Sequence, residues 1–189
     1  SGKTIVSSDL KDEKTRELLH THLGKKLENG VVCHGSFFIG PKDFYSALND
    51  MPEDERRLFS MTGVDYVNQL YGNEELKSLQ RKDGRFVNAG MMVTLLGAVV
   101  SDGLESGNIV SGVGGQYNFV SMAHALEDGR LIMMIRSTKQ NNGNVSSNIV
   151  FNYGHTTIPR HLRDIVVTEY GIADLRGKCD QEVIAALLN

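Results

Sequence analysis

The sequence predicts an α/β protein with a largely parallel sheet flanked by helices. Short apolar segments of strand length alternate along the chain with segments whose apolar residues recur at helical spacing. The continuous apolar run Leu131–Ile135 is typical of a central strand covered on both faces. A glycine-rich turn at 112–116 joins a predicted strand to a predicted helix. No repeat or linker divides the 189 residues, so a single domain over 1–189 is expected.

The elements before the glycine-rich turn are predicted from residue spacing and turn residues. A helix is expected from Asp9 onward, because Leu19, Leu23 and Leu27 recur at every fourth residue. The stretch 64–71 is ambiguous between a helix and an irregular crossover. The other expected elements are a buried strand at 31–34, an apolar run at 37–39, helices over 41–48, 53–59 and 73–82, a strand at 85–88, a buried strand pair or a strand entering a loop at 91–100, and a central strand at 108–110.

The elements after the turn again alternate between helix and strand. A helix is predicted from four apolar residues that share one face: Phe119, Met122, Ala123 and Leu126. Strands are expected at 131–135, 147–151 and 165–168, a polar loop at 137–148, and a closing helix over 180–188. Because that helix stops abruptly at Asn189, we expect the chain to be a domain cut from a longer polypeptide.

The composition disfavours several classes of function. A formal net charge of −3 argues against a nucleic-acid binder that works through a broad basic face. No apolar run approaches the roughly 18 residues of a membrane helix. Two cysteines are too few for a disulfide framework, so a cytoplasmic location is expected. No metal site is expected, because His20 and His22 would not face each other on a helix. Cys33 is either a thiol nucleophile or a buried strand thiol.

The glycine-rich turn is the strongest local signal. Gly112, Gly114 and Gly115 fall between a predicted strand end and a predicted helix start. Such a turn leaves amide N–H groups free at the positive end of the helix dipole, and glycine lets a ligand approach the main chain closely. The dinucleotide-binding fingerprint fails, because Tyr117 occupies the position of its third glycine. The turn is therefore either an anion site or a tight turn without a ligand.

The residues around the turn resemble those of a known family. The sequence is similar to the C-terminal domain of the acetyl-CoA hydrolase/CoA-transferase family in Ser111–Val120 (SGVGGQYNFV), in Ile165–Lys178 (IVVTEYGIADLRGK) and in Ser146–Val150 (SSNIV) between them. That family includes 4-hydroxybutyrate and succinyl-CoA:acetate CoA-transferases. The resemblance extends from about Val31 onward. It implies a CoA-transferase-like α/β domain related to ribose-5-phosphate isomerase.

The resemblance also implies a reaction. Enzymes of this kind move CoA between carboxylates, as in acetate metabolism, or hydrolyse acyl-CoA, through a glutamyl-CoA intermediate. The family's glutamate lies before its C-terminal domain, in a motif that these 189 residues lack, and neither Glu105 nor Glu127 has a matching context. We therefore expect acyl-CoA and a small carboxylate as substrates, the N-terminal domain of the same polypeptide as partner, a homodimer, and an inactive isolated chain.

Candidate site residues follow from the same resemblance. The amides of Gly114 and Gly115 are expected to donate to the thioester oxygen, and Gly112 to allow close passage of the pantetheine. Gln116 and Asn118 are expected to add side-chain hydrogen bonds. Ser137 and Lys139 lie in a segment that looks like the family's S-T-A-K without its alanine, so Lys139 either holds a CoA phosphate or is a solvated loop lysine.

The remaining candidates lie further along the chain. Asn148 and Asn88 match polar positions near the family's cleft, or are turn or cap residues. Glu169 and Tyr170 follow a predicted strand, where open α/β sheets gather ligand groups. Asp174 and Arg176 are expected to form a structural ion pair.

Two other classes of function stay open. One is a non-catalytic phosphate- or nucleotide-binding module that uses the same turn. The other is a sugar-phosphate isomerase, whose acid/base pair and phosphate-loop lysine the sequence does not supply.

Overall fold

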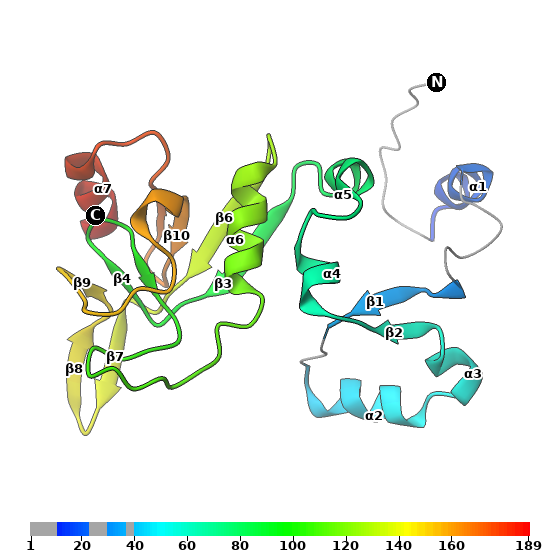
Figure 1. Cartoon of the computed structure of the whole chain (residues 1–189), viewed down its shortest axis with the longest axis horizontal. Helices are drawn as coiled ribbons and strands as arrows, with labels where there is room; N and C mark the ends of the chain where they lie inside the picture. The colour runs from blue at the N-terminus through cyan, green and yellow to red at the C-terminus, as the bar shows by residue number, and fades with distance from the viewer. Residues whose placement is uncertain (1–10, 23–29, 37–39) are drawn as a thin grey trace. The chain divides into compact units, whose positions relative to one another are not determined.

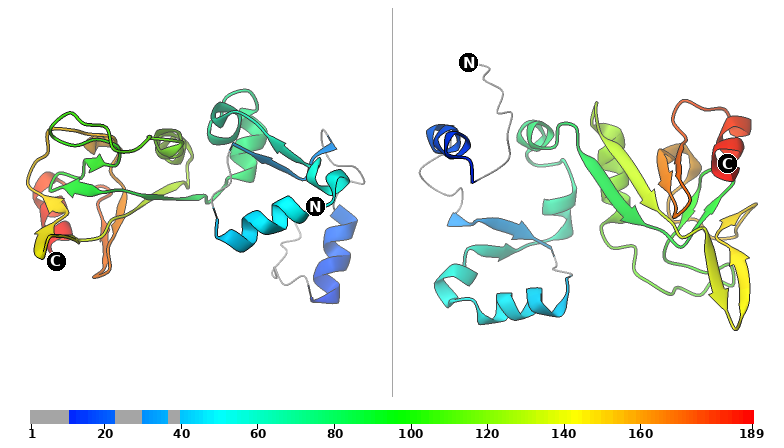
Figure 2. Two further views of the ribbon diagram at one scale, coloured as in Figure 1. Left: turned by 90° about the horizontal axis from the view of Figure 1, so that it is seen from below. Right: turned by 180° about the vertical axis from the view of Figure 1, so that it is seen from behind.

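The computed structural model describes residues 11–22, 30–36 and 40–189, and the chain forms two compact units (Figure 1, Figure 2). The first unit comprises residues 1–63 and the second residues 64–189. The single domain expected over 1–189 stays a prediction. Within the described ranges, every helix is too short or too polar to cross a membrane.

The first unit combines helices with a two-stranded parallel sheet. Its elements are α1 (Glu13–His22), β1 (Cys33–Gly35), α2 (Lys42–Asp50), α3 (Glu53–Arg56) and β2 (Phe59–Met61). The helix expected over 53–59 ends at Arg56, because Phe59 pairs with the partly buried Cys33 of β1. The expected helix start at Asp9, Leu23, Leu27 and the apolar run 37–39 lie outside the described residues.

The second unit carries most of the predicted elements. They are α4 (Val64–Asn68), α5 (Glu74–Gln80), β3 (Arg85–Ala89), β4 (Met92–Thr94), β5 (Val99–Val100), α6 (Gln116–Ala125), β6 (Arg130–Met134), β7 (Thr138–Asn141), β8 (Asn144–Ser147), β9 (Ile149–Val150), the 3-10 helix η2 (Arg160–Leu162), β10 (Ile165–Val167), β11 (Ile172–Asp174) and α7 (Asp180–Leu188). The ambiguous stretch 64–71 begins with a helix, α4. The buried strand pair at 91–100 is confirmed as β4 and β5.

The sheets of the second unit are mixed, so the prediction of a largely parallel sheet is wrong. In the sheet ordered β11-β10-β6-β3, the last three strands are parallel and β11 is antiparallel to β10. β11 reverses because only 168–171 connects it to β10, where the Thr168 amide donates to the Gly171 carbonyl; a parallel crossover needs a dozen or more residues. In the second sheet, β4 is antiparallel to β5 and parallel to β9.

The core lies on one face of the four-stranded sheet. Leu131 and Met133 of β6 are buried, and α6 packs against β3 and β6 (Figure 1). The same core cluster contains Val183 of α7. On the opposite face, Met134 is 48% exposed and Val87 is 53% exposed. β6 is central as predicted, but the expected burial on both faces is wrong, because within this unit the helices cover one face.

Two loop predictions are also corrected. Residues 108–110 form no central strand: Ile109 is 64% exposed and makes one isolated bridge, to Gly103, because no strand of the described residues lies beside it. The expected polar loop at 137–148 contains the hairpin β7–β8. Its turn residues, Asn142 and Gly143, both have positive φ (49° and 83°), as a two-residue type I′ hairpin turn requires.

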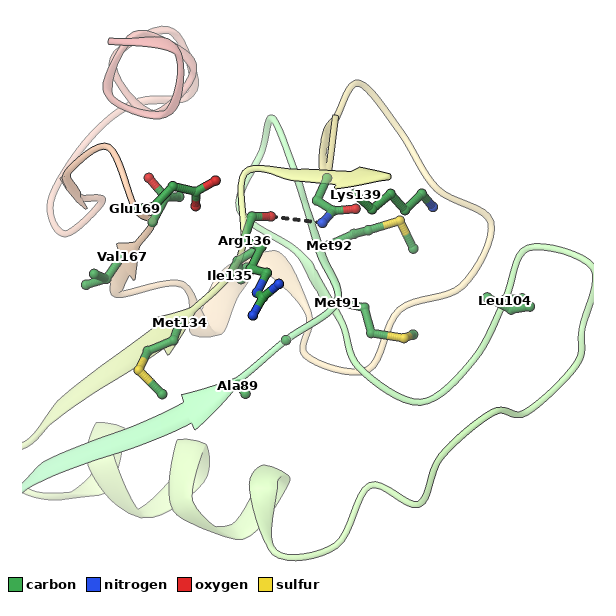
Figure 3. Close-up of a pocket in the computed structure, with 13 residues that line it drawn as sticks. Ala89, Met91, Met92, Leu104, Met134, Ile135, Arg136, Lys139, Val167 and Glu169 are labelled. Atoms are coloured by element: carbon green, nitrogen blue, oxygen red, sulfur yellow. Dashed lines mark hydrogen bonds between the residues drawn. The ribbon is translucent and has the colours of Figure 1, made fainter. Parts of the chain in front are cut away.

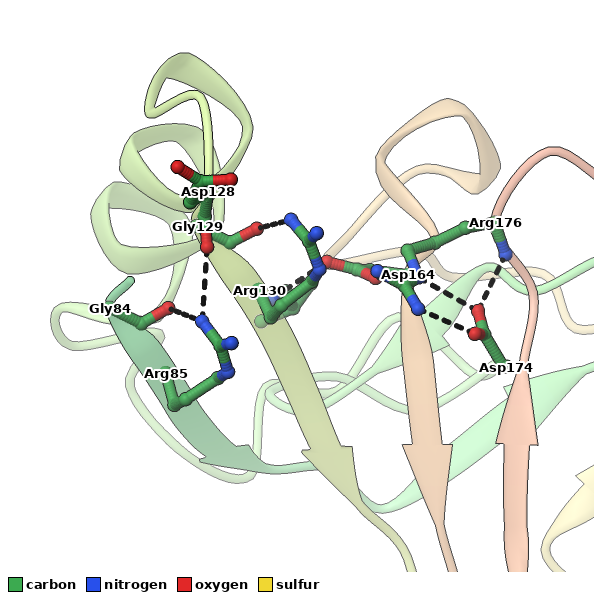
Figure 4. Close-up of polar contacts among 9 residues, drawn as sticks. Gly84, Arg85, Asp128, Gly129, Arg130, Asp164, Asp174 and Arg176 are labelled. Carbon is green, nitrogen blue, oxygen red and sulfur yellow. Dashed lines mark hydrogen bonds and ion pairs between the residues drawn. The ribbon is translucent and has the colours of Figure 1, made fainter. Parts of the chain in front are cut away.

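Polar and ionic contacts join the strands at the end of the sheet where the three parallel strands begin and β11 ends (Figure 4). The buried Asp164 carboxylate accepts the Leu131 amide at 2.7 Å and lies 3.5 Å from Arg176 Nε. Arg176 also pairs with Asp174 at 2.6 Å, which confirms the predicted ion pair. The side-chain bond from Arg176 lowers the pKa of Asp174 to about 2. These contacts link β6, β10 and β11 and leave the carboxyl ends of the three parallel strands, at the opposite end of the sheet, for a site.

Candidate functional site

A cavity of about 710 Å³ lies at the carboxyl ends of the three parallel strands (Figure 3). Ala89, Met134 and Val167 are the last residues of β3, β6 and β10, and they face away from the core. The apolar part of the wall is completed by Met91, Met92, Leu104 and Ile135. Methionine is unbranched and flexible, so this wall suits an apolar ligand of elongated shape.

Two cations and one carboxylate line the same cavity. Arg136 follows β6, Lys139 lies in β7, and Glu169 follows β10. In the described part of the chain, neither the Arg136 guanidinium nor the Lys139 ammonium makes a hydrogen bond or an ion pair. The cavity therefore carries a net positive charge and two available donor groups, which suit a phosphate or a carboxylate.

Glu169 is fixed by Ser137. The Ser137 hydroxyl donates to Glu169 Oε1 at 2.6 Å, and the Ser137 amide donates to Oε2 at 2.9 Å. These bonds lower the pKa of Glu169, the hydroxyl bond first, and the positive charge of Arg136 lowers it further. The carboxylate is therefore ionised at neutral pH.

Asn148 lines the cavity and holds an unused acceptor that is fully buried. The residue is 6% exposed, and its Nδ2 donates to the Arg136 carbonyl at 2.9 Å. Its amide donates to the Ser137 carbonyl at 2.7 Å, and its own carbonyl accepts the Val93 amide at 2.9 Å. No donor among the described residues reaches its buried Oδ1. Buried polar atoms without a partner are uncommon and point to a ligand or to water.

The glycine-rich turn keeps its amides available. Gly114 has a φ of +58°, and within the described ranges the amides of Gly114 and Gly115 donate to no protein acceptor. Gln116 Nε2 donates to the Ala89 carbonyl at 2.8 Å, so the start of α6 is tied to the end of β3. Among the described residues, the buried Gln116 Oε1 has no hydrogen-bond partner.

The structure brings together only part of the predicted site. Lys139, Asn148 and Glu169 line the cavity, and Ser137 contacts it through Glu169. The residues Gly112, Gly114, Gly115, Gln116 and Asn118 do not belong to its lining, although Gln116 binds the carbonyl of Ala89, which does. Tyr170 lies in a neighbouring groove, and Asn88 donates to the Phe86 carbonyl outside the lining.

Sequence reasoning missed Arg136 and the methionines of the wall. Arg136 directly follows the predicted strand 131–135, just as Glu169 follows the predicted strand 165–168. The rule that ligand groups gather at strand carboxyl ends would have pointed to both. Met91 and Met92 carried no such signal, because their place depends on the pairing of β4 with β9.

The fold and the cavity define a mixed α/β domain with a ligand site at the carboxyl ends of parallel strands. Residues 40–189 match the model of the acetyl-CoA hydrolase/transferase C-terminal domain. The chain belongs to this family.

Individual relatives agree with this assignment. The chain is 33% identical over 159 residues to the 4-hydroxybutyrate coenzyme A transferase of Clostridium kluyveri, covering 82% of this chain and 34% of that protein. The crystal structure of RipA from Yersinia pestis matches with a TM-score of 0.64 and 30% identity, over 84% of this chain and 33% of that one. The crystal structure of 4-hydroxybutyrate CoA-transferase from Porphyromonas gingivalis matches with a TM-score of 0.56 and 25% identity, with the same coverage. The chain spans about a third of the length of these relatives.

Proposed function

We propose that this chain is the CoA-binding C-terminal domain of an acyl-CoA hydrolase or CoA-transferase. The observation that carries the proposal is the cavity, in which Arg136 and Lys139, unpaired among the described residues, lie beside an apolar wall. CoA joins anionic phosphates to an uncharged pantetheine arm, and the cavity offers a surface for each. The resemblance of the site segments to a CoA-transferase family, to which the chain belongs, supports the same ligand.

In the proposed reaction, CoA moves between carboxylates through a glutamyl-CoA intermediate. The nucleophilic glutamate belongs to the N-terminal domain of the same polypeptide, and the acceptor is a small carboxylate. The free amides of Gly114 and Gly115 donate to the oxyanion that forms when the carboxylate attacks the thioester. Lys139 holds a CoA phosphate. The proposed assembly is a cytoplasmic homodimer, and no metal takes part.

Calorimetry on the 189-residue chain tests the binding proposal. We expect CoA to bind, and Arg136→Gln or Lys139→Gln to weaken it by roughly tenfold, because each removes a charge-assisted contact. Lys82→Gln, at an exposed turn, is the charge-matched control and should bind as the parent does. Binding of ADP with equal affinity would favour a nucleotide-binding module instead. Selective binding of ribose 5-phosphate would favour an isomerase, and no binding of CoA would refute the proposal.

An activity assay tests where the nucleophile lies. We expect the isolated chain to transfer no acyl group from acetyl-CoA to a carboxylate, since the glutamate motif is missing from its sequence. Rapid transfer by this chain alone would place the nucleophile within the 189 residues and contradict that part of the proposal.

A further inference from the structure

Strand β11 leaves main-chain groups unpaired at the edge of the four-stranded sheet. In the order β11-β10-β6-β3, its one neighbour among the described strands is β10. We infer that this edge is a self-association surface, where β11 pairs antiparallel with β11 of a second copy of the chain. The inference specifies the surface of the proposed homodimer and rests on that part of the proposed function. It is independent of the cavity, because β11 contributes no residue to the described lining.

The pairing of β10 with β11 shows which main-chain groups face outward. The Thr168 amide donates to the Gly171 carbonyl, and hydrogen-bonded residues alternate along an antiparallel strand. Gly171 and Ala173 therefore direct their main-chain groups toward β10. The amides and carbonyls of Ile172 and Asp174 point away from the sheet, and among the described residues they meet no donor or acceptor. The edge thus offers both donors and acceptors to another strand.

The side chains at this edge are apolar and exposed. Ile172 is 74% exposed, and Tyr170, in the turn before it, is 83% exposed. Both line a groove of about 690 Å³ together with Leu188 at the end of α7, the helix that packs against β11. Proteins commonly block an exposed strand edge with proline or lysine, and residues 171–175 contain neither. This edge therefore has the properties of a surface that another strand covers.

One antiparallel register uses all of the outward groups. A two-fold axis through Ala173 places Ile172 opposite Asp174 of the partner subunit, so that the two residues exchange both main-chain hydrogen bonds. The same register brings the Tyr170 ring near Arg176 of the partner subunit, a favourable cation–π pair. A register centred on Asp174 would place two carboxylates opposite each other, which is unfavourable. Asp174 is also paired with Arg176 of its own chain, so the contact encloses no unpaired carboxylate (Figure 4).

The symmetry of this contact limits the assembly to two copies. A two-fold axis uses the same edge on both subunits, so each β11 is fully paired once the dimer has formed. The two sheets then continue into one, and each cavity remains on its own subunit. The partner that this edge fits is therefore a second copy of the chain rather than a growing chain of subunits.

Sedimentation and hydrogen exchange of the 189-residue chain test the surface. We expect a concentration-dependent dimer, in which the Ile172 and Asp174 amides exchange at least about tenfold more slowly at high than at low protein concentration. The Ala173 amide, which faces β10 in either state, should exchange at nearly the same rate in both. A chain that stays monomeric up to about 1 mM would overturn the inference. A dimer in which the Ile172 and Asp174 amides stay unprotected would also overturn it.

A pair of proline variants assigns the contact to the main chain. Ile172→Pro removes an outward N–H without removing a bond to β10, and should weaken the dimer by at least about tenfold. Ile109→Pro is the matched control, because Ile109 is 64% exposed and its amide also donates to no described acceptor. It should dimerise as the parent does. Equal dimer dissociation constants for Ile172→Pro and the parent would contradict the inference.

CoA binding separates this inference from the rest of the proposed function. Ile172→Pro should bind CoA as the parent does, because Ile172 lies outside the cavity lining. If the parent dimerises through β11 but binds no CoA, the proposed ligand is wrong and the surface stands. If it binds CoA but stays monomeric, the surface is wrong and the ligand stands. Should Ile172→Pro fail to fold by circular dichroism, the exchange comparison on the parent chain decides.

Discussion

Ser137 and Glu169 join the ends of two neighbouring parallel strands. The Ser137 hydroxyl and amide donate to the two oxygens of the Glu169 carboxylate at 2.6 and 2.9 Å. Ser137 follows β6 and Glu169 follows β10, so this contact links the carboxyl ends of the two strands beside the cavity. Hydrogen bonding rather than burial sets the state of the carboxylate, because Glu169 is exposed.

Ser137→Ala should raise the pKa of Glu169 toward its ordinary value of 4.5, without reaching it, because the amide bond remains. A folded-state pKa below the unfolded value contributes stability above about pH 4.5, and this contribution is lost as the pH falls through the lowered pKa. The variant should therefore lose less stability on acidification than the parent does. Carbon-13 NMR titration of the side-chain carboxyl measures the shift. Ser146→Ala, on exposed β8, is the control, and an unchanged pKa in Ser137→Ala would contradict the assigned cause.

The glycines of the turn should differ in their tolerance of a side chain. A Cβ on Gly115 would overlap Nδ2 of Asn68, which is 2% exposed and cannot move aside, so Gly115→Ala should cost about 2 to 3 kcal/mol of unfolding free energy. Gly114 has open space but a φ of +58°, and Gly114→Ala should cost about 1 kcal/mol. Gly112→Ala, with neither constraint, should be nearly neutral. Urea unfolding measures all three, and a different order would contradict the packing described for Gly115.

Local spacing explains what the sequence could predict. The helix after the turn, the strand at 131–135 and the closing helix were recognised because their apolar residues repeat within a few positions, as α6, β6 and α7 confirm. The Asn142-Gly143 dipeptide is an equally local hairpin signal, which the expected loop at 137–148 does not include.

Pairing between distant segments explains what the sequence could not predict. Val87 pairs with Ile132, and Ile132 pairs with Ile165, although 45 and 33 positions separate the partners along the chain. These pairings place Ala89, Met134 and Val167 side by side and so create the cavity. The reversal of β11 and the exposed position of 108–110 likewise depend on which strands are available as neighbours. No periodicity within a short window contains that information.

Thr157 should control the segment that leads into the glycine-rich turn. Its hydroxyl donates to Asp102 and accepts the Ser101 amide at 2.8 Å, and the Thr157 bond is the first cause that lowers the pKa of Asp102. The Asp102 carbonyl in turn accepts the amides of Val110 and Ser111. Thr157→Val removes both hydroxyl bonds, each of about 0.5 to 1.5 kcal/mol, and should speed hydrogen exchange of these two amides by about tenfold. Thr156→Val, at an exposed neighbour, should leave the exchange of these amides unchanged. Equal exchange rates in the two variants would show that the Thr157 hydroxyl does not stabilise this segment.

Asp164 should matter more to stability than its exposed neighbour Asp174. Asp164→Ala leaves the Leu131 amide without its 2.7 Å acceptor, in a buried position between β6 and β10, and should cost about 1 to 3 kcal/mol. Asp174→Ala removes a 2.6 Å ion pair whose side chains are 44% and 41% exposed, and such surface pairs contribute about 0 to 1 kcal/mol. Urea unfolding at neutral pH measures both variants. An Asp174→Ala cost equal to that of Asp164→Ala would mean that the surface pair contributes as much as the buried amide contact to holding this end of the sheet together.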